Sequence, residues 1–497
     1  MQLRPPAPPL LALAAAVLGL AVLRGWLATR IGFTEDEAYY RLWGLAPAMS
    51  YLDHPPMTGW MIAAGQWIAG DTLLGTRLPA VVAPVIGSLV LWRATGLLFG
   101  ASVATRAVWL SLAMPLLAVG GIVMTPDIPS VLFWGLTAWA LAELYVSGNA
   151  TWWLAVGAFA GLGMISKYSN LFAGAGIALW LLVLPANWRW LRTWQLWTGG
   201  ALAALITLPV VIWNAEHGWA SFSKQFGRVV HSNGLTLRYL GELIGSVLGL
   251  AGPVIAVLAA IGLWQAIKRI VADRDERRIM LLASAVPFPA YLVLHSLHDR
   301  VQANWPAPIY PTIAVLAALA IEEAMQRPEP APARARLTAR WAMATGLALT
   351  GLIYLQALHP LVHLPGDQDP TSMTRGWDDL ADKVERLARE KGARWVVTTN
   401  YTTAAELAFA LRGRLPVTQL DERIRYIHLP PLPADVLASP ALYVELARRS
   451  NAGMAAARFA HVEALGSLDR VDAGNVVASY PVYRLSTPIG DPLDPAS

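Results

Sequence analysis

Long apolar segments separated by short polar ones run along the chain from Leu10 to Leu358. A bilayer core of roughly 30 Å needs about 20 apolar residues in one helix, and most of these segments approach that length. The pattern predicts an all-α, multi-pass membrane domain with about eleven transmembrane helices, or up to about thirteen. The predicted spans lie near residues 10–28, 78–98, 106–124, 127–146, 151–165, 170–185, 197–213, 242–266, 279–296, 306–323 and 341–358.

The first apolar segment has the position of a signal peptide, but its other features differ. It runs long, it carries Arg24, and no small-residue cleavage pattern stands before the acidic residues that follow it. We therefore expect a helix that the mature protein retains.

The pattern changes after His359-Pro360, where apolar runs shorten and charged residues become frequent. Residues 378–391 and 402–411 have the pattern of helices, and residues 394–399 have that of a buried strand. The sequence thus predicts two parts: a membrane domain over residues 1–360 and a soluble α/β domain over residues 361–497.

Composition agrees with a multi-pass membrane protein. Of 497 residues, 56% are hydrophobic and only 14% are charged, and the net charge of +5 is small for the chain's length. These values give no support to nucleic-acid binding. The chain has no cysteine, which excludes disulfides, a thiolate nucleophile and a zinc-thiolate site.

Basic loops predict how the chain is oriented. Residues 187–192, 268–278 and 327–340 are rich in arginine and fall on one side of the membrane under this span count. Positive loops mark the cytoplasmic side, so we expect the N-terminus there. The outer loops 30–77, 214–240 and 296–306 and the C-terminal domain are then extracytoplasmic, in the periplasm if the source is a bacterium.

Acidic residues gather where the chain leaves the first apolar segment. Glu35, Asp36 and Glu37 are consecutive, and Asp53-His54 follows directly before two prolines. Because charged groups at a bilayer edge are costly, this cluster predicts chemistry there; the alternative is a solvated acidic loop. Proline fixes the backbone and stops a helix, so we expect Asp53 and His54 to lie at a rigid turn.

Two more charged residues lie between apolar segments. Asp127 stands between two prolines and could join Asp36 and Asp53 at one site, where three carboxylates would suit a divalent cation. The alternative role of Asp127 is that of a helix N-cap. Lys167 would cost roughly 2.5 to 3.5 kcal/mol at membrane depth without an anion. The Lys167 ammonium could bind an anionic ligand, or it could contact lipid head groups alone.

Six motifs follow one another in an order that resembles a known family. They are Asp36-Glu37-Ala38-Tyr39-Tyr40, Tyr51-Leu52-Asp53-His54-Pro55-Pro56, Thr125-Pro126-Asp127-Ile128-Pro129, Ser166-Lys167-Tyr168, Trp213-Asn214-Ala215-Glu216-His217-Gly218-Trp219 and Asn304-Trp305-Pro306-Ala307-Pro308. Over nearly its whole length the chain resembles glycosyltransferase family 39, in the branch related to protein O-mannosyltransferases and to the aminoarabinose transferase of lipid A. The stretch from Asn400 to Phe409 resembles the outer domain of that branch.

The resemblance implies a membrane glycosyltransferase of the GT-C architecture, which takes its sugar from a polyprenyl phosphate. Such an enzyme must remove a proton from the acceptor hydroxyl and stabilise the departing phosphate. We place Asp36 and Glu37 in the catalytic set, with Asp36 as general base. Like-charge repulsion from Glu35 and Glu37 is expected to raise the pKa of Asp36 toward neutrality.

His54 and Lys167 are the predicted ligands of the donor phosphate. The lipid A relative carries a lysine where this chain has His54, and an arginine where it has Tyr39. Histidine would give a contact that depends on pH. The alternatives for His54 are a turn histidine bonded to the backbone and a metal ligand.

Further residues are expected to support the site or line its cavity. Asp53 and Asp127 are the supporting acids, which could also hold a metal. The predicted cavity residues are Tyr39, Tyr40, His217, Lys224, Arg228, Arg300, Asn304 and Trp305. For Trp305 the alternative is a place in the interfacial aromatic belt. The reaction implies no certain cofactor, and a divalent cation stays an open alternative.

The sequence therefore predicts an inner-membrane glycosyltransferase that moves a sugar to an extracytoplasmic hydroxyl, with inversion. Its predicted partners are a polyprenyl-phosphate sugar, membrane lipids, and an acceptor that is lipid A or another glycolipid, a polysaccharide or a protein. Two rivals remain: a lipid or polysaccharide transporter, which would also place charges at helix breaks, and a membrane anchor with an inactive core. A transporter predicts paired broken helices in two repeats, and the sequence shows none.

Overall fold

The computed structural model describes residues 8–230, 234–362 and 368–494. It divides into two compact units. The membrane unit lies within Met1–Leu27, Met49–Thr58 and Arg77–Ile353, and the C-terminal unit lies within Ala28–Ala48, Gly59–Thr76 and Tyr354–Ser497. Most of residues 30–77, the first of the predicted outer loops, thus clusters with the C-terminal part of the chain.

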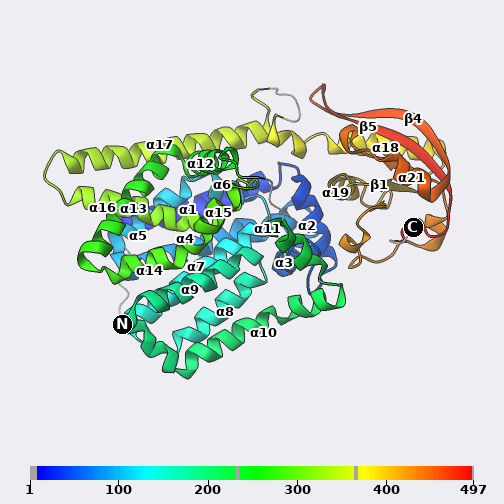
Figure 1. The fold of residues 1–497 in the computed structure, drawn as a ribbon. Coiled ribbons are helices and arrows are strands. Elements are labelled where there is room, and N and C mark those ends of the chain that lie inside the picture. The colour runs from blue at the N-terminus through cyan, green and yellow to red at the C-terminus, as the bar shows by residue number, and fades with distance from the viewer. Residues whose placement is uncertain (1–7, 231–233, 363–367, 495–497) are drawn as a thin grey trace. The chain divides into compact units, whose positions relative to one another are not determined.

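Helices make up the membrane unit (Figure 1). They are α1 (Pro8–Ala28), α4 (Leu73–Phe99), α5 (Ala101–Leu112), α6 (Pro115–Gly120), α7 (Asp127–Ser147), α8 (Trp152–Met164), α9 (Leu171–Val183), α10 (Trp194–Glu216), α11 (Ala220–Val230), α12 (Arg238–Ala251), α13 (Pro253–Asp273), α14 (Glu276–Ala285), α15 (Pro287–Ser296), α16 (Tyr310–Met325) and α17 (Ala331–Leu358). Short 3₁₀ helices are η1 (Tyr168–Asn170), η2 (Pro185–Arg192) and η3 (Ala307–Ile309).

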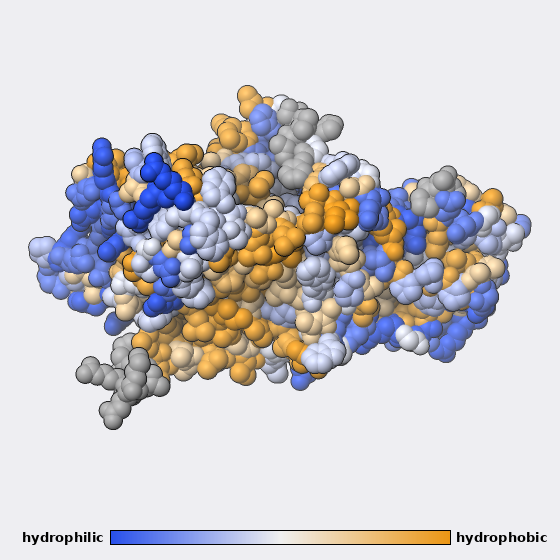
Figure 2. All heavy atoms as spheres, turned by 90° about the horizontal axis from the view of Figure 1, so that it is seen from below, coloured by the Kyte–Doolittle hydropathy of each residue, from blue (hydrophilic) through white to orange (hydrophobic). Residues whose placement is uncertain are grey.

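Seven helices in the described part of the chain are long and apolar enough to cross a membrane, or nine if two bent pairs each count as one span. Helix α10, for example, exposes Leu205, Leu208 and Ile212. Figure 2 shows such hydrophobic side chains as a broad surface. Exposed apolar area of this extent is typical of lipid contact. The predicted multi-pass membrane domain is confirmed, with fewer full-length spans than about eleven.

Interruptions of the helices explain why fewer full-length spans are present than expected. The expected span 106–124 is interrupted because Pro115 begins the separate helix α6, and α8 has only 13 residues. The expected span 242–266 is divided at Gly252, which has a φ of 85°. Glycine adopts this conformation readily, whereas other residues would be strained in it. Pro253 then begins α13. Apolar composition continues across these breaks, whereas the helix does not.

Small residues let helices of the membrane unit approach closely. Helix α8 packs against α7 and α10, and α13 packs against α16. A Cβ at Gly157 would lie 2.0 Å from the carbonyl oxygen of Gly199, and one at Gly199 would lie 2.3 Å from that of Trp153. Backbone thus touches backbone between α8 and α10, as is common where helices meet in membranes.

The C-terminal unit holds a mixed sheet with helices beside it (Figure 1). Its strand order is β2-β1-β3-β5-β4, in which β1 is parallel to β2 and β3 while β5 is antiparallel to β3 and β4. The strands are β1 (Trp395–Thr398), β2 (Val417–Gln419), β3 (Ala441–Val444), β4 (Phe459–Asp472) and β5 (Asn475–Pro488). The predicted α/β fold is confirmed.

The helices of this unit include two from the first outer loop. They are α2 (Glu35–Leu45), α3 (Met57–Ala69), α18 (Trp377–Lys391), α19 (Tyr401–Ala410), α20 (Ala434–Leu437) and α21 (Ala452–Arg458), with the 3₁₀ helices η4 (Pro370–Thr374), η5 (Arg423–Arg425) and η6 (Ala447–Arg449). Helix α19 packs against α2. The rings of Phe33 and Phe409 meet at 4.7 Å, and Arg41 lies 4.9 Å over Phe409. Aromatic and cation–π contacts therefore join the acidic loop to the sheet domain.

The close packing of α8 against α10 can be tested by substitution. We expect Gly199→Ala to lower the thermal unfolding midpoint in detergent, because its Cβ would force the two helices apart at a cost of about 1 to 3 kcal/mol. Gly200→Ala is the matched control, since a Cβ there meets nothing within 4 Å. Equal midpoints for the two variants would contradict the close packing.

Candidate functional site

Lys167 lies in the membrane unit, in a short non-helical segment between two helices. Helix α8 ends at Met164, and Lys167 takes an extended conformation with φ −157° and ψ 137°. Its backbone N–H still donates to the carbonyl of Gly163 at 3.1 Å. The side chain is therefore presented at a helix end rather than along a helix face.

Asp127 binds this lysine. Nζ of Lys167 donates to Oδ1 of Asp127 at 2.6 Å, and Nδ2 of Asn304 donates to Oδ2 at 2.6 Å. The side chains of Lys167 and Asp127 are only 12% and 9% exposed, so the pair lies largely out of water. Asp127 is not the N-cap of α7, because that position is Pro126 and has no side-chain cap. Its carboxylate in the first turn is nonetheless favoured by the helix dipole.

His54 belongs to a tight turn, as the prolines predict. The backbone N–H of Tyr51 donates to the carbonyl of His54 at 3.2 Å. The N–H of Met57 donates to the carbonyl of Ile165 at 2.9 Å, which ties the turn to the end of α8. His54 and Lys167 therefore reach the same cavity although they lie far apart in the sequence.

Helix α11 covers this turn from the other side. Lys224 forms an ion pair with Asp53 at 3.3 Å, and Nε2 of Gln225 donates to the carbonyl of Asp53 at 2.6 Å. Ser221 and Tyr168 share a hydrogen bond of 2.8 Å between their hydroxyls. The second outer loop is thus fastened both to the His54 turn and to η1.

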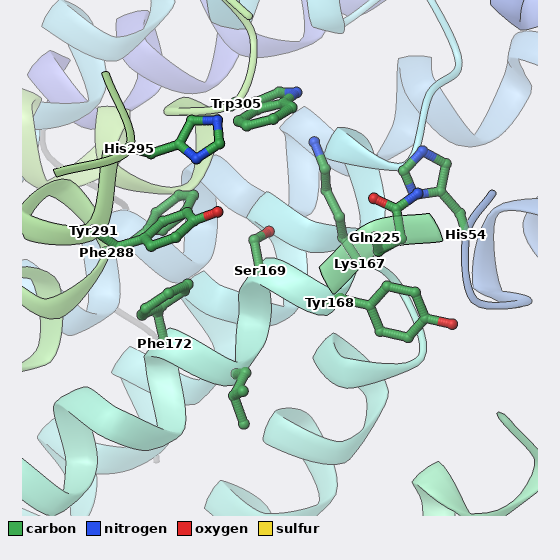
Figure 3. A pocket seen from close by; sticks show the side chains of 11 residues that line it. His54, Lys167, Tyr168, Ser169, Phe172, Gln225, Phe288, Tyr291, His295 and Trp305 are labelled. Atoms are coloured by element: carbon green, nitrogen blue, oxygen red, sulfur yellow. The ribbon is translucent and has the colours of Figure 1, made fainter. Parts of the chain in front are cut away.

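These elements enclose a cavity of about 250 Å³ within the membrane unit. Its lining residues are His54, Lys167, Tyr168, Ser169, Leu171, Phe172, Gln225, Phe288, Tyr291, His295 and Trp305. In Figure 3 the amino group of Lys167 points toward the part of the cavity lined by His54 and Trp305. The cavity therefore carries a cation and a histidine at one place and aromatic rings elsewhere.

The aromatic wall is continuous. Phe172 stacks on Tyr291 at 4.8 Å and on Phe288 at 5.3 Å, and His295 lies 5.7 Å from Tyr291 and 5.6 Å from Trp305. Such a wall offers apolar faces to a ligand while His295 and Tyr291 supply polar atoms. A ligand with an anionic group and an apolar or sugar face would fit both parts.

Not every predicted cavity residue lines this cavity. His217 stacks on Trp213 at 4.2 Å, with its Nδ1 2.7 Å from the carbonyl of Trp213. Arg300 is 64% exposed and pairs with Glu242 at 3.0 Å. Asn304 and Lys224 contact Asp127 and Asp53 instead of lining the wall. Arg228 lies on α11, and its side chain falls outside the described atoms.

The acidic cluster begins helix α2 in the C-terminal unit. Thr34 and Glu37 form a capping box, in which each side chain accepts from the other's backbone N–H at 3.4 Å. Glu37 is fully buried, whereas Asp36 is exposed and its Oδ1 accepts from the hydroxyl of Tyr401 at 2.9 Å. Glu35 pairs with Arg449 at 3.2 Å. The three consecutive acids therefore have three different environments.

Tyr39 and Tyr40 are buried among other rings. Tyr39 lies 5.2 Å from Trp43 and 5.1 Å from Tyr401, and Tyr40 lies 4.6 Å from Trp43. They contribute to the packing of α2 inside the C-terminal unit. Their predicted place in a substrate cavity stays a prediction.

Two of the three acids that were expected to share a cation have lysine partners. Asp53 contacts Lys224 and Asp127 contacts Lys167, while Asp36 contacts Tyr401. Within the ranges that the structure describes, no group of three or more His, Asp or Glu side chains has the arrangement of a metal site. The expectation of a divalent cation therefore remains untested.

Several residues of the cavity were missed by sequence reasoning. Phe172, Phe288 and Tyr291 lie in apolar segments and have the appearance of ordinary membrane-helix residues. No feature of the sequence pointed to Gln225.

Tyr401, the partner of Asp36, was also missed. It belongs to a motif that resembles the family's outer domain, and this motif was the one signal that could have marked it.

Glu445 organises the start of α19 in the C-terminal unit. Its fully buried carboxylate accepts from the N–H groups of Thr399 at 3.0 Å and Asn400 at 2.8 Å, and from the hydroxyl of Thr403 at 2.5 Å. Burial raises the pKa of Glu445, and these hydrogen bonds only partly offset that effect.

The ion pair at Lys167 generates a second test. We expect Lys167→Met to lower the free energy of unfolding by about 3 to 5 kcal/mol, because it leaves the buried carboxylate of Asp127 without its cation. Adding Asp127→Asn should recover part of that loss, so the double variant is more stable than the sum of the single changes predicts. Arg238→Gln is the control, because its pair with Glu242 is 77% exposed at the arginine. Strict additivity would argue against the pair.

The raised pKa of Glu445 predicts a pH trend. Its stabilising contribution is complete below the unfolded pKa and is lost as pH rises through the higher folded pKa. The wild-type protein should therefore lose stability relative to Glu445→Gln as pH rises from about 4, where unfolded glutamate titrates, toward neutrality. Thermal unfolding of both proteins across this range measures the difference, and a constant difference would contradict the shift.

Comparison with known proteins shows which family and which relative the chain is similar to. Residues 53–213 match the family model described as dolichyl-phosphate-mannose-protein mannosyltransferase. Lipid A galacturonosyltransferase RgtD from Rhizobium johnstonii is 25% identical over 414 residues, which cover 79% of this chain and 82% of the relative.

Solved structures have the same fold. ArnT from Cupriavidus metallidurans bound to undecaprenyl phosphate aligns with a TM-score of 0.65 at 14% identity, covering 94% of this chain and 97% of that one. The Archaeoglobus fulgidus oligosaccharyltransferase aligns with a TM-score of 0.56 at 12% identity, covering 88% and 67%. The GT-C architecture expected from the sequence is confirmed. Residues 53–213 are therefore similar to the dolichyl-phosphate-mannose-protein mannosyltransferase family, and most of the chain is similar to a lipid A galacturonosyltransferase.

Proposed function

We propose that this protein is a membrane glycosyltransferase that moves a sugar from a polyprenyl phosphate to an extracytoplasmic hydroxyl. One observation carries the proposal: a largely buried lysine, bonded to Asp127, faces a cavity that also has a histidine and an aromatic wall. A cation at a helix break suits a phosphate, and aromatic rings suit a sugar or an isoprenoid chain. The family match supports the same reaction class.

The proposed reaction is a single displacement at the anomeric carbon. The acceptor oxygen forms a bond to that carbon while its proton passes to a carboxylate. The bond from the anomeric carbon to the phosphate oxygen breaks, and the polyprenyl phosphate leaves with the electron pair. Attack opposite the leaving group inverts the configuration at this carbon.

Asp36 is the base in this proposal. Its side chain is exposed, which allows it to meet an acceptor hydroxyl. Glu37 is less suited to take the proton itself, because it is fully buried and bonded to the backbone of Thr34. In the proposal Glu37 contributes by fixing the first turn of α2, on which Asp36 stands.

Lys167 and His54 would hold the donor phosphate. Asp127 orients the lysine and is itself bonded by Asn304, and the turn before Pro55 orients the histidine. The lysine partners of Asp53 and Asp127 support neutralisation by ammonium groups instead of a metal. Activity with and without a chelator tests the alternative of a divalent cation.

The relative from Rhizobium johnstonii is named for lipid A and for galacturonic acid. We therefore propose a lipid A-type glycolipid as the first acceptor to test and a uronic acid as the first sugar. Polysaccharide and protein hydroxyls follow as acceptors. The basic loops support a bacterial inner-membrane location with the N-terminus in the cytoplasm and the reaction on the outer side. The transporter alternative gains no support, since the named relatives are transferases.

A transfer assay tests the proposal. Purified protein is given a panel of polyprenyl-phosphate sugars with a lipid A acceptor, and released polyprenyl phosphate is measured. We expect release by the wild type, and a fall of at least about 100-fold for Asp36→Asn, because the loss of a general base typically costs 10² to 10⁴ in rate. Lys167→Met should also lower the rate, through a weaker hold on the departing phosphate.

The matched control is Asp378→Asn, which removes an exposed carboxylate from the first turn of α18. This variant should transfer sugar at the wild-type rate. Absence of release from every donor would count against the transferase. Full activity of Asp36→Asn would leave the transferase standing and remove Asp36 as its base.

A further inference from the structure

Tyr401 of the C-terminal domain and Asp36 of the first outer loop form a hydrogen bond although 365 positions separate them in the chain. We infer that Tyr401 is a positioning residue for Asp36, so that the C-terminal domain contributes directly to the geometry of the base. This inference rests on the proposed function. It assigns a task to a domain whose role the sequence leaves open.

The hydrogen bond between Tyr401 and Asp36 has an ordinary length. Oη of Tyr401 lies 2.9 Å from Oδ1 of Asp36, with the phenol donating to a carboxylate. Hydrogen bonds to an ionised acceptor are shorter and stronger than neutral ones. The phenol restricts the carboxylate to the orientation in which this bond is made.

The ring of Tyr401 contacts two neighbouring side chains. Its ring lies 5.1 Å from that of Tyr39, and the guanidinium of Arg425 lies 4.4 Å over its ring. Arg425 is 5% exposed and donates through Nε to Glu422 at 2.7 Å. A cation over the ring face withdraws electron density and makes the phenol a better donor. A residue that only filled space would not need this arrangement.

The helix that carries Tyr401 is fixed at its start. Glu445, at the end of β3, accepts from the backbone of Thr399 and Asn400 and from the hydroxyl of Thr403. Asn400 caps α19 by accepting from the N–H of Thr402. Hydrogen bonds therefore fix the start of α19, and Tyr401, the first residue of this helix, bonds the Asp36 carboxylate.

Charges around Asp36 set the direction of its response to pH. Glu35 and Glu37 on α2 disfavour its ionisation, and Arg449 of η6 offsets Glu35 through the ion pair. The Tyr401 hydroxyl favours ionisation, with Arg425 behind its ring. Loss of the hydroxyl should therefore raise the pH at which the base becomes active.

Tyr401→Phe tests the inference in the transfer assay, because it removes one oxygen and keeps the ring. We expect kcat to fall about tenfold with KM within about twofold, since orientation of the base matters in the transition state and not in binding. The acidic limb of the pH profile should move upward by about one pH unit. In the Asp36→Asn background the same substitution should change nothing, because Tyr401 acts through Asp36.

Tyr483→Phe is the matched control, an equal change on β5 of the same sheet, beside Tyr443 at 5.9 Å. It should keep the wild-type rate and pH profile. A lower unfolding midpoint for Tyr401→Phe without a shifted pH profile would overturn the inference, because it would reduce Tyr401 to a packing role. So would a wild-type rate and profile in that variant.

The same assay separates this inference from the proposed function. Release by the wild type that is lost in Asp36→Asn and unchanged in Tyr401→Phe overturns only the role of Tyr401. Absence of release by the wild type from every donor overturns the proposed function and this inference with it.

Discussion

The ion pair between Lys167 and Asp127 is the interaction on which the membrane unit's cavity depends. An ammonium so far from water needs an anion close by, and Asp127 supplies one at 2.6 Å. The same carboxylate accepts from Asn304, which anchors the loop before Trp305. One acid thus joins the start of α7, the end of α8 and the third outer loop. Of the residues in the aromatic wall, Trp305 directly follows Asn304 in the loop that this contact holds.

A second constraint governs the C-terminal unit. The acidic helix α2 is fastened to α19 by stacked rings, by Arg41 over Phe409, and by the contact of Tyr401 with Asp36. Arg41 is itself held by Asp71 through a bond of 2.6 Å from Nε. Asp36 and Glu37, the two residues of the proposed catalytic set, therefore belong to the C-terminal unit.

Hydropathy predicted the membrane class and the positions of many helices, and the domain boundary at His359-Pro360 stays a prediction. It failed at Pro115 and Gly252, because apolar composition continues where the backbone cannot remain helical. Ordered motifs marked Asp127, Lys167 and His54 as residues of interest, and the structure places His54 and Lys167 on one cavity. Local patterns could not reveal the partner of Asp36, since Tyr401 comes near it only through tertiary packing. They also could not distinguish Phe172 or Tyr291 from residues that face lipid.

The neutral charge of the Lys167–Asp127 pair has a consequence for turnover. An ammonium without a counterion would hold a phosphate dianion tightly both before and after the reaction, and the spent lipid carrier would then be slow to leave. Asp127 and Lys167 together carry no net charge, so the attraction for the product phosphate is limited to short-range hydrogen bonds. Under the proposed function, the acid that keeps the lysine in place also keeps product release fast.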